Sequence, residues 1–149
     1  MGLKGKKVAF IGAGNMAEAI IRGLLKADVV AAPDILATGR RQERIDELHR
    51  LYGLTVTLDN GEAAKQADVV VLCVKPQILE KVLSEIGGSI SPDALVISVA
   101  AGITMRQIGA HLNEHARICR SMPNMPSVVG AGAAALAFGK HLTQEDKQM

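Results

Sequence analysis

The chain has 149 residues, of which 48% are hydrophobic, so it is the size of one domain and can bury a substantial core. Its formal net charge is only +2, which excludes the dense basic surface that nucleic acids and anionic membranes attract. One tyrosine, two phenylalanines and no tryptophan are too few rings to stack the bases of single-stranded nucleic acid.

In the first half of the chain, short β-branched runs alternate with segments of helical periodicity. This pattern predicts strands over residues 7–11, 35–38 and 54–57. Helices are expected from about Asn15, from about Gln42 up to Gly53, and over residues 61–66. Each strand is thus followed by a helix, as in repeated βα units.

The second half continues this alternation. Residues 69–74 are apolar on both faces, which is typical of a central parallel strand. Pro76 suits the first turn of a helix, Thr104 is expected to cap another, and strands are predicted over residues 94–99, 117–120 and 133–137. We therefore predict an α/β fold of the Rossmann type, a doubly wound, mostly parallel sheet with helices on both faces.

Residues 143–149 resemble the beginning of a further helix, because Thr143 can serve as the N-cap and acidic residues follow it. We expect residues 1–142 to form the domain and residues 143–149 to begin a truncated helix that leads into a missing C-terminal part.

Cys73 and Cys119 lie in apolar runs and form no CxxC pair, which favours buried, reduced thiols. The chain contains neither a secretory signal nor an apolar run long enough to cross a membrane. We therefore expect a cytoplasmic protein without membrane or nucleic-acid partners. The four histidines lack the spacing of zinc ligands, and no metal site is predicted.

The strongest motif runs from Ile11 to Ala17 and has the pattern GxGxxA between a predicted strand and a predicted helix. Gly12 permits the tight turn, Gly14 lets the backbone approach a diphosphate, and Ala17 allows close packing. Free amides at the start of the helix attract phosphate groups. The alternative is a glycine turn that binds nothing.

The second predicted strand ends in Thr38-Gly39-Arg40-Arg41, where sites that prefer NAD usually carry an acidic residue. Two guanidinium groups and a hydroxyl can instead hold a ribose 2′-phosphate, which favours NADPH, with NADH also possible. The missing acid also argues against a methyltransferase. Alternatively, the two arginines are solvated charges at a helix start.

Ligands of open α/β sheets bind at the carboxyl ends of the strands around the switch point. There Lys75 places a cation before Pro76, and Ser98 to Gly102 are small residues against which a nicotinamide ring could lie. A surface lysine and ordinary tight packing are the alternatives. After strand 117–120, prolines on both sides of Asn124 indicate a stiff loop, from which Asn124 could face a substrate or simply form a turn.

Taken together, these motifs resemble those of the pyrroline-5-carboxylate reductases over nearly the whole chain. The matching segments are Ile11-Gly12-Ala13-Gly14-Asn15-Met16, Val74-Lys75-Pro76-Gln77, Ala100-Ala101-Gly102-Ile103 and Arg120-Ser121-Met122-Pro123-Asn124-Met125-Pro126.

The resemblance implies a role for each segment. Gly12 to Met16 would line the diphosphate, with Ile11 before them also part of the cofactor site. Gly39 and Arg40 would flank the 2′-phosphate, and Asn60 would reach the adenosine, unless Asn60 is only a helix N-cap. Val74, Lys75, Pro76, Ala100 and Ala101 would line the ribose and nicotinamide.

The implied reaction is NADPH-dependent reduction of 1-pyrroline-5-carboxylate to L-proline, by hydride transfer to the C=N carbon. The family's second, helical domain holds the substrate and forms the homo-oligomer. It has no counterpart in these 149 residues, so the isolated chain is expected to be inactive.

Two alternative functions remain open. The first is another NADP-dependent enzyme of the 6-phosphogluconate dehydrogenase-like superfamily, such as a β-hydroxyacid dehydrogenase or an F420-dependent NADP reductase. The second is a non-catalytic nucleotide-sensing module.

Overall fold

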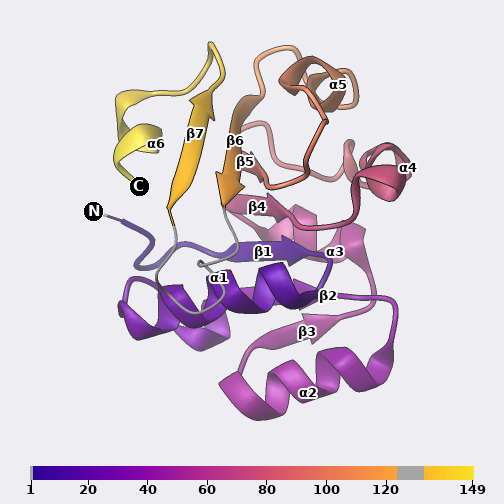
Figure 1. The fold of residues 1–149 in the computed structure, drawn as a ribbon, viewed down its shortest axis with the longest axis vertical. Helices are drawn as coiled ribbons and strands as arrows, with labels where there is room; N and C mark the ends of the chain where they lie inside the picture. The colour runs from indigo at the N-terminus through magenta and orange to yellow at the C-terminus, as the bar shows by residue number, and fades with distance from the viewer. Residues whose placement is uncertain (1, 124–132) are drawn as a thin grey trace.

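The computed structural model describes residues 2–123 and 133–149, and their strands form one sheet (Figure 1). The sheet has seven strands in the order β3-β2-β1-β4-β5-β6-β7. The strands are β1 (Val8–Ile11), β2 (Ile35–Thr38), β3 (Thr55–Thr57), β4 (Val69–Leu72), β5 (Leu95–Ser98), β6 (Arg117–Pro123) and β7 (Ala134–Phe138).

All neighbouring strands from β3 to β6 pair in parallel, and only β7 at the edge is antiparallel. The chain builds outward from β1 through β2 to β3, then returns to place β4 on the other side of β1. The order of the strands therefore reverses between β1 and β4, which is the switch point of a doubly wound sheet. The predicted fold class is confirmed.

The helices cover both faces of the sheet. They are α1 (Asn15–Lys26), α2 (Gln42–Tyr52), α3 (Asn60–Gln66), α4 (Pro76–Ile86), α5 (Met105–Gly109) and α6 (Gln144–Gln148). Two apolar clusters form the core, one where α3, α4 and α5 pack on the sheet and one where α1 and α2 pack on its other face. None of the helices in the described residues is long and apolar enough to cross a membrane.

The helix boundaries follow the signals predicted from the sequence. Pro76 occupies the first turn of α4, Thr104 forms a capping box with Gln107 at the start of α5, and Thr143 does the same with Asp146 in α6. Helix α2 ends at Gly53, whose φ of +73° is the left-handed conformation that glycine adopts readily.

Two strands end two or more residues away from the predicted end. Strand β4 ends at Leu72 rather than at residue 74, because the chain turns there toward Pro76 and α4. Strand β6 continues to Pro123 instead of ending at residue 120, because Ser121, Met122 and Pro123 pair with the antiparallel β7. The prediction of a stiff loop directly after strand 117–120 was therefore wrong for Ser121, Met122 and Pro123.

Both cysteines are free, as expected. Cys119 is buried, and Cys73 is half-buried against the apolar cluster beneath α1 and α2. Burial raises the pKa of the Cys73 thiol to about 12. The pKa of Cys119 is raised for the same reason. Both thiols are therefore protonated and unreactive near neutral pH.

Candidate functional site

The segments that follow β1, β4 and β5 lie next to one another at the carboxyl edge of the sheet. Ile11 is in register with Leu72, and Leu72 is in register with Ser98. Beyond the strands, the Cys73 amide donates to the Ile11 carbonyl at 2.9 Å, and the Val99 amide donates to the Leu72 carbonyl at 3.2 Å. The switch point thus brings together the three segments that the sequence motifs single out.

Gly12 is held where no other residue fits without strain. Its φ is +102°, and a Cβ atom on it would lie 2.8 Å from Val74 Cγ1 and 3.0 Å from the Val74 backbone nitrogen. The glycine loop between β1 and α1 therefore packs directly against the segment that follows β4. Gly12 is needed for this close approach as well as for the turn.

Gly14 has the opposite surroundings, because a Cβ atom on it would meet nothing within 4 Å. It is the N-cap of α1, and no side chain caps that helix. The first amides of an α-helix have no partners within the helix and attract anions, and α1 is 12 residues long. Gly14 and Asn15 are exposed and Met16 is half-buried, so an anion has open access to this helix start.

Two exposed arginines lie beside this loop. Arg41 is the N-cap of α2, Arg40 precedes it, and neither forms an ion pair with any residue that the structure describes. A Cβ atom on Gly39 would lie 3.1 Å from Ile45 Cγ2 and 3.5 Å from Ala13 Cβ. The segment that carries the arginines therefore packs closely against the glycine loop.

The Thr38 side chain contacts the protein backbone and is not free to bind a phosphate, contrary to the prediction from the sequence. Its side chain is fully buried, where its hydroxyl donates to the Phe10 carbonyl at 3.4 Å and accepts the Gly12 amide at 3.3 Å. Thr38 therefore ties β2 to the beginning of the glycine loop. We correct the prediction that its hydroxyl is free for a ligand.

Asn60 is not a helix cap, which was the alternative for it. Asp59 is the N-cap of α3, and its carboxylate accepts the Glu62 amide at 3.0 Å. Asn60 is the first residue of the helix and is half-buried. Because α3 follows β3, Asn60 lies at the same edge of the sheet as the ends of β1 and β2.

The remaining predicted residues follow β4 and β5. Lys75 is exposed as the N-cap of α4, and Val74 and Pro76 beside it are half-buried. After β5, the Ala100 amide donates to the Ser98 hydroxyl at 3.3 Å, and Ala100 is buried while Ala101 is exposed.

The methyl groups of Ala13 and Ala100 and the side chain of Ile11 belong to the core, so these residues can meet a ligand only through their backbone. Asn124 lies outside the described residues. Among the described residues, no cluster of histidine, cysteine or carboxylate side chains could hold a metal ion.

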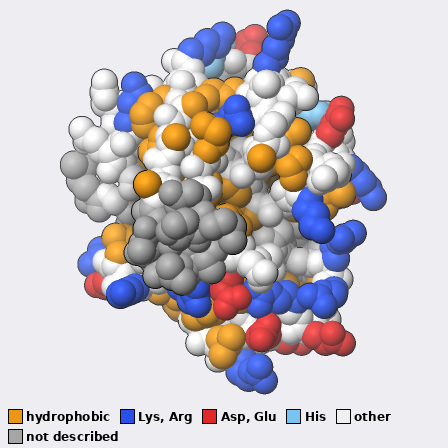
Figure 2. Space-filling view, in the orientation of Figure 1, with side chains coloured by type: hydrophobic (Ala, Val, Ile, Leu, Met, Phe, Trp, Pro, Cys, Tyr) orange, Lys and Arg blue, Asp and Glu red, His pale blue; other side chains and the backbone are white. Residues whose placement is uncertain are grey.

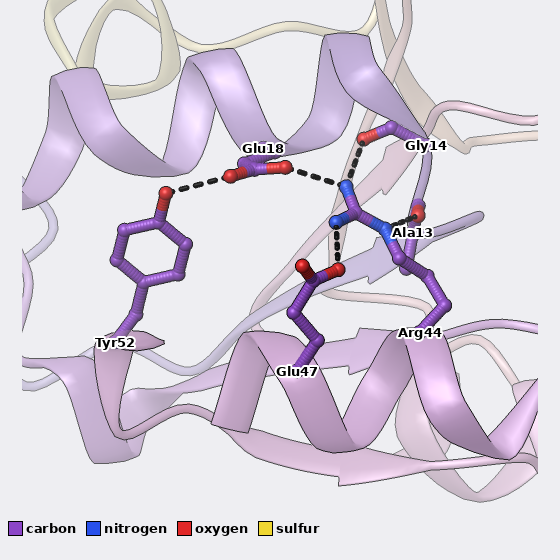
Figure 3. Close-up of polar contacts among 6 residues, drawn as sticks. All are labelled: Ala13, Gly14, Glu18, Arg44, Glu47 and Tyr52. Carbon is purple, nitrogen blue, oxygen red and sulfur yellow. Dashed lines mark hydrogen bonds and ion pairs between the residues drawn. The ribbon is translucent and has the colours of Figure 1, made fainter. Parts of the chain in front are cut away.

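The prediction from sequence missed a polar network beneath the glycine loop (Figure 3). Arg44 of α2 donates from Nε to the Ala13 carbonyl at 3.0 Å and from one terminal nitrogen to the Gly14 carbonyl at 3.5 Å. Its terminal nitrogens also pair with Glu18 at 2.6 Å and Glu47 at 2.8 Å. The hydrogen bond from the Tyr52 hydroxyl to Glu18, 2.7 Å long, closes the network.

These contacts set the protonation of the network. The Tyr52 hydroxyl, together with the Arg44 guanidinium, holds the pKa of Glu18 below its ordinary value, and the bond to Glu18 raises the pKa of Tyr52. Burial opposes the charge of Arg44, but its bonds to Glu18 and Glu47 outweigh that effect and raise its pKa. Glu18 and Arg44 are therefore both charged at neutral pH, while the Tyr52 hydroxyl keeps its proton and donates it to Glu18.

A cavity formed by the described residues lies elsewhere, on the face of the sheet that α1 covers, and it extends from β1 and β4 to β6 and β7. It has a volume of about 400 Å³ and is almost entirely apolar, with Ile97, Leu136 and Phe138 among its walls. Leu136 and Phe138 are exposed, and Figure 2 shows hydrophobic side chains gathered on this side of the molecule. Asp146 and Lys147 are the charged residues among the described residues that line it, and one lysine beside a carboxylate does not make a binding site for a dinucleotide diphosphate.

Comparison with known proteins gives one family and several similar proteins. Residues 7–102 match the family described as NADP oxidoreductase, coenzyme F420-dependent. The chain is 40% identical over 145 residues to pyrroline-5-carboxylate reductase 1 of Bacillus subtilis, covering 97% of the chain and 49% of that protein. It is 38% identical over 141 residues to the Escherichia coli pyrroline-5-carboxylate reductase, covering 95% of the chain and 52% of that protein.

Solved structures agree with this result. A pyrroline-5-carboxylate reductase from Coxiella burnetii superposes with a TM-score of 0.92 at 38% identity, over 96% of this chain and 53% of that one. The Plasmodium falciparum pyrroline carboxylate reductase with NADP bound gives a TM-score of 0.84 at 26% identity, over 96% of this chain and 52% of that one. The resemblance inferred from the motifs is confirmed, and the chain spans about half the length of these relatives.

Proposed function

The chain belongs to the family described as NADP oxidoreductase, coenzyme F420-dependent, and from this premise we propose that it is the cofactor-binding half of a pyrroline-5-carboxylate reductase. The whole protein would reduce 1-pyrroline-5-carboxylate to L-proline with NADPH, the last step of proline biosynthesis, and NADH would be a weaker substitute. The proposal is supported by the relatives named above and by the residues at the carboxyl edge of the sheet.

The observation that carries the proposal is the helix start at Gly14, which no side chain of residues 2–123 and 133–149 caps, beside two arginines that form no ion pair with those residues. A diphosphate fits this start because backbone amides and the helix dipole both favour an anion there, and no Cβ obstructs it. Arg40 and Arg41 are close enough in sequence and structure to serve a 2′-phosphate on the adenosine ribose, and the guanidinium fork suits phosphate oxygens. Asn60 would approach the adenosine from the neighbouring α3.

Val74, Lys75 and Pro76 after β4 and the backbone at Ala100 and Ala101 after β5 would orient the nicotinamide and its ribose. When bound, NADPH supplies a hydride from its nicotinamide ring to the C=N carbon of the substrate. The task of the chain's own residues is to hold that ring in one orientation at the edge of the sheet, which lowers the barrier through positioning.

Further parts of the proposal concern the whole protein. Asn124 would face the substrate, and groups that hold the substrate carboxylate and ring nitrogen would come from the half of the relatives' length that this chain does not span. That half would also form a homo-oligomer, and the protein would work in the cytoplasm on a small molecule, without nucleic-acid or membrane partners. Within the part of the chain that the structure describes, Leu136 and Phe138 of β7 are exposed, and this apolar surface would suit such contacts.

The cofactor assignment is tested by titrating the chain with NADPH and with NADH, and repeating both titrations with Arg40→Ala. We expect the substitution to weaken NADPH binding by about tenfold or more and to leave NADH nearly unchanged, because only NADPH carries the 2′-phosphate. An equal loss for both dinucleotides would contradict the role of Arg40.

The activity is tested with purified 1-pyrroline-5-carboxylate and NADPH. We expect little or no proline from the 149 residues alone, and rapid formation from a protein that includes a second half like that of the relatives. Robust turnover by the isolated chain would contradict this division of labour. A coenzyme F420-dependent activity, which the family description raises as an alternative, would show as reduction of NADP by reduced F420.

A further inference from the structure

Arg44 occupies a place that none of the recognised motifs explains. It lies on α2, three residues after Arg41, and its guanidinium reaches across to the carbonyls of Ala13 and Gly14 (Figure 3). Its side chain is only 16% exposed, and its bond to the Ala13 carbonyl is partly buried, whereas its longer bond to the Gly14 carbonyl is exposed. The residue therefore connects the helix that starts with the candidate 2′-phosphate arginines to the loop that starts the candidate diphosphate site.

The contact helps to fix the orientation of the glycine loop, in which the Gly14 carbonyl also accepts the Glu18 amide at 3.1 Å and the Gly14 amide donates to the Gly12 carbonyl at 2.9 Å. A peptide unit is planar, so its carbonyl and its amide point in opposite directions. Because the Ala13 and Gly14 carbonyls point toward Arg44, the amide of Asn15, which shares the Gly14 peptide unit, points away from α2. Gly12 and Gly14 give the loop conformational freedom that other residues lack. A bond to its carbonyls from outside the loop limits that freedom.

The partners of Arg44 hold the guanidinium itself in place. Glu18 on α1 and Glu47 on α2 accept from its two terminal nitrogens, and Glu18 is held in turn by the Tyr52 hydroxyl. Planar guanidinium groups can make several such bonds at once in a fixed geometry, which an ammonium group cannot do. The two helices and the loop are thus joined through one side chain.

We propose that Arg44 is a positioning residue for dinucleotide binding, which holds the glycine loop and the start of α2 in one fixed arrangement so that the diphosphate and the 2′-phosphate are bound together. This inference rests on the proposed function. Arg44 does not touch the dinucleotide; it acts through the backbone of Ala13 and Gly14 and through α2.

The test compares Arg44→Met with Arg50→Met in the intact 149-residue chain. Arg50 lies on the same helix but is exposed, so its substitution is matched in chemistry and removes none of the contacts above. The dissociation constants for NADPH and NADH are measured at a temperature where each variant is folded by circular dichroism. We expect Arg44→Met to raise both constants by about tenfold, because both ligands share the diphosphate, and Arg50→Met to change neither.

Two further variants separate positioning from folding. Arg44→Lys keeps the charge but cannot bridge carbonyls and carboxylate together, so we expect partial recovery of affinity for both dinucleotides. Tyr52→Phe removes only the hydrogen bond from the Tyr52 hydroxyl to Glu18. If Arg44→Met does not fold, this variant still tests the proposal. We expect Tyr52→Phe to weaken the binding of NADPH and NADH about equally, and by less than Arg44→Met does.

The proposal also predicts that the effects of Arg40→Ala and Arg44→Met on NADPH affinity are not additive. Arg40→Ala should cost less NADPH affinity in the Arg44→Met background than in the wild type, because the 2′-phosphate and diphosphate sites are no longer held together. Unchanged constants in folded Arg44→Met and Tyr52→Phe, with only a lower melting temperature, would overturn the inference alone. A wild-type chain that binds neither dinucleotide would overturn the proposed function as well.

Discussion

Replacing Gly12 with alanine separates the packing role of the glycine loop from its binding role. The new Cβ would lie 2.8 Å from Val74 Cγ1, 3.0 Å from the Val74 nitrogen and 3.1 Å from the Cys73 carbonyl carbon. Two of these three atoms are backbone, so the contacts cannot be relieved by rotating a side chain. Alanine would also have to adopt a φ of +102°.

The size of the effect follows from these two causes. A non-glycine residue in an unfavourable backbone conformation costs roughly 1–3 kcal/mol. Crowding in a well-packed region costs about as much again, roughly 1–3 kcal/mol. We therefore expect Gly12→Ala to lower the free energy of unfolding by about 2–6 kcal/mol, a large share of the stability of a typical domain.

The assay is urea denaturation followed by circular dichroism, with NADPH titration of the folded protein in parallel. Gly14→Ala is the matched control, because its Cβ would meet no protein atom and its φ of −92° suits alanine. We expect Gly14→Ala to change stability by less than about 1 kcal/mol, since only a helix cap is altered. Its Cβ would occupy the open space at the start of α1, so NADPH affinity should fall.

Equal stability losses for Gly12→Ala and Gly14→Ala would refute this reasoning about the two glycines. Wild-type NADPH affinity in Gly14→Ala would refute the assignment of the open space at Gly14 to the diphosphate.

Three further outcomes follow from buried groups. Thr38→Val leaves the Gly12 amide without its acceptor, so we expect a loss of about 1–3 kcal/mol in urea denaturation; an unchanged midpoint would contradict this. Because burial raises the pKa of Cys73 to about 12, iodoacetamide at pH 8 should label it in urea but not in the folded chain, as mass spectrometry would show. The same shift means that its contribution to stability is complete below the ordinary thiol pKa and is lost as the pH rises toward 12. Asp146→Ala removes both the 2.9 Å ion pair with Arg117 and the capping box with Thr143, so hydrogen exchange should accelerate in residues 144–149, and unchanged exchange there would contradict the role of Asp146 in holding α6 to β6.

Most of the fold was predictable because the signals are local. The alternation of β-branched runs with amphipathic segments gave the order of strands and helices, and caps such as Thr104 marked helix starts. The extension of β6 was not predictable, because it depends on pairing with β7. The prolines near Asn124 indicate a turn, whereas strand pairing is a long-range contact that local sequence does not reveal.

The candidate site could likewise be predicted only in part from the sequence. The glycine pattern and the two exposed arginines could be recognised from neighbouring residues. The burial of Thr38 could not, because it depends on its contacts with Phe10 and Gly12 across the sheet. Arg44 was missed for a similar reason, since its carbonyl and Glu18 partners are 26 to 31 residues away in the sequence.

The most direct test of the dinucleotide site is an NMR titration of the ¹⁵N-labelled chain with NADPH. We expect the largest amide shifts at Gly12, Gly14, Asn15 and Met16, with a second group at Gly39 and Arg40. The same titration with NADH should retain the first group and reduce the second, because NADH lacks the 2′-phosphate. Shifts confined to the apolar face at β6 and β7, with the glycine loop unaffected, would contradict the assignment.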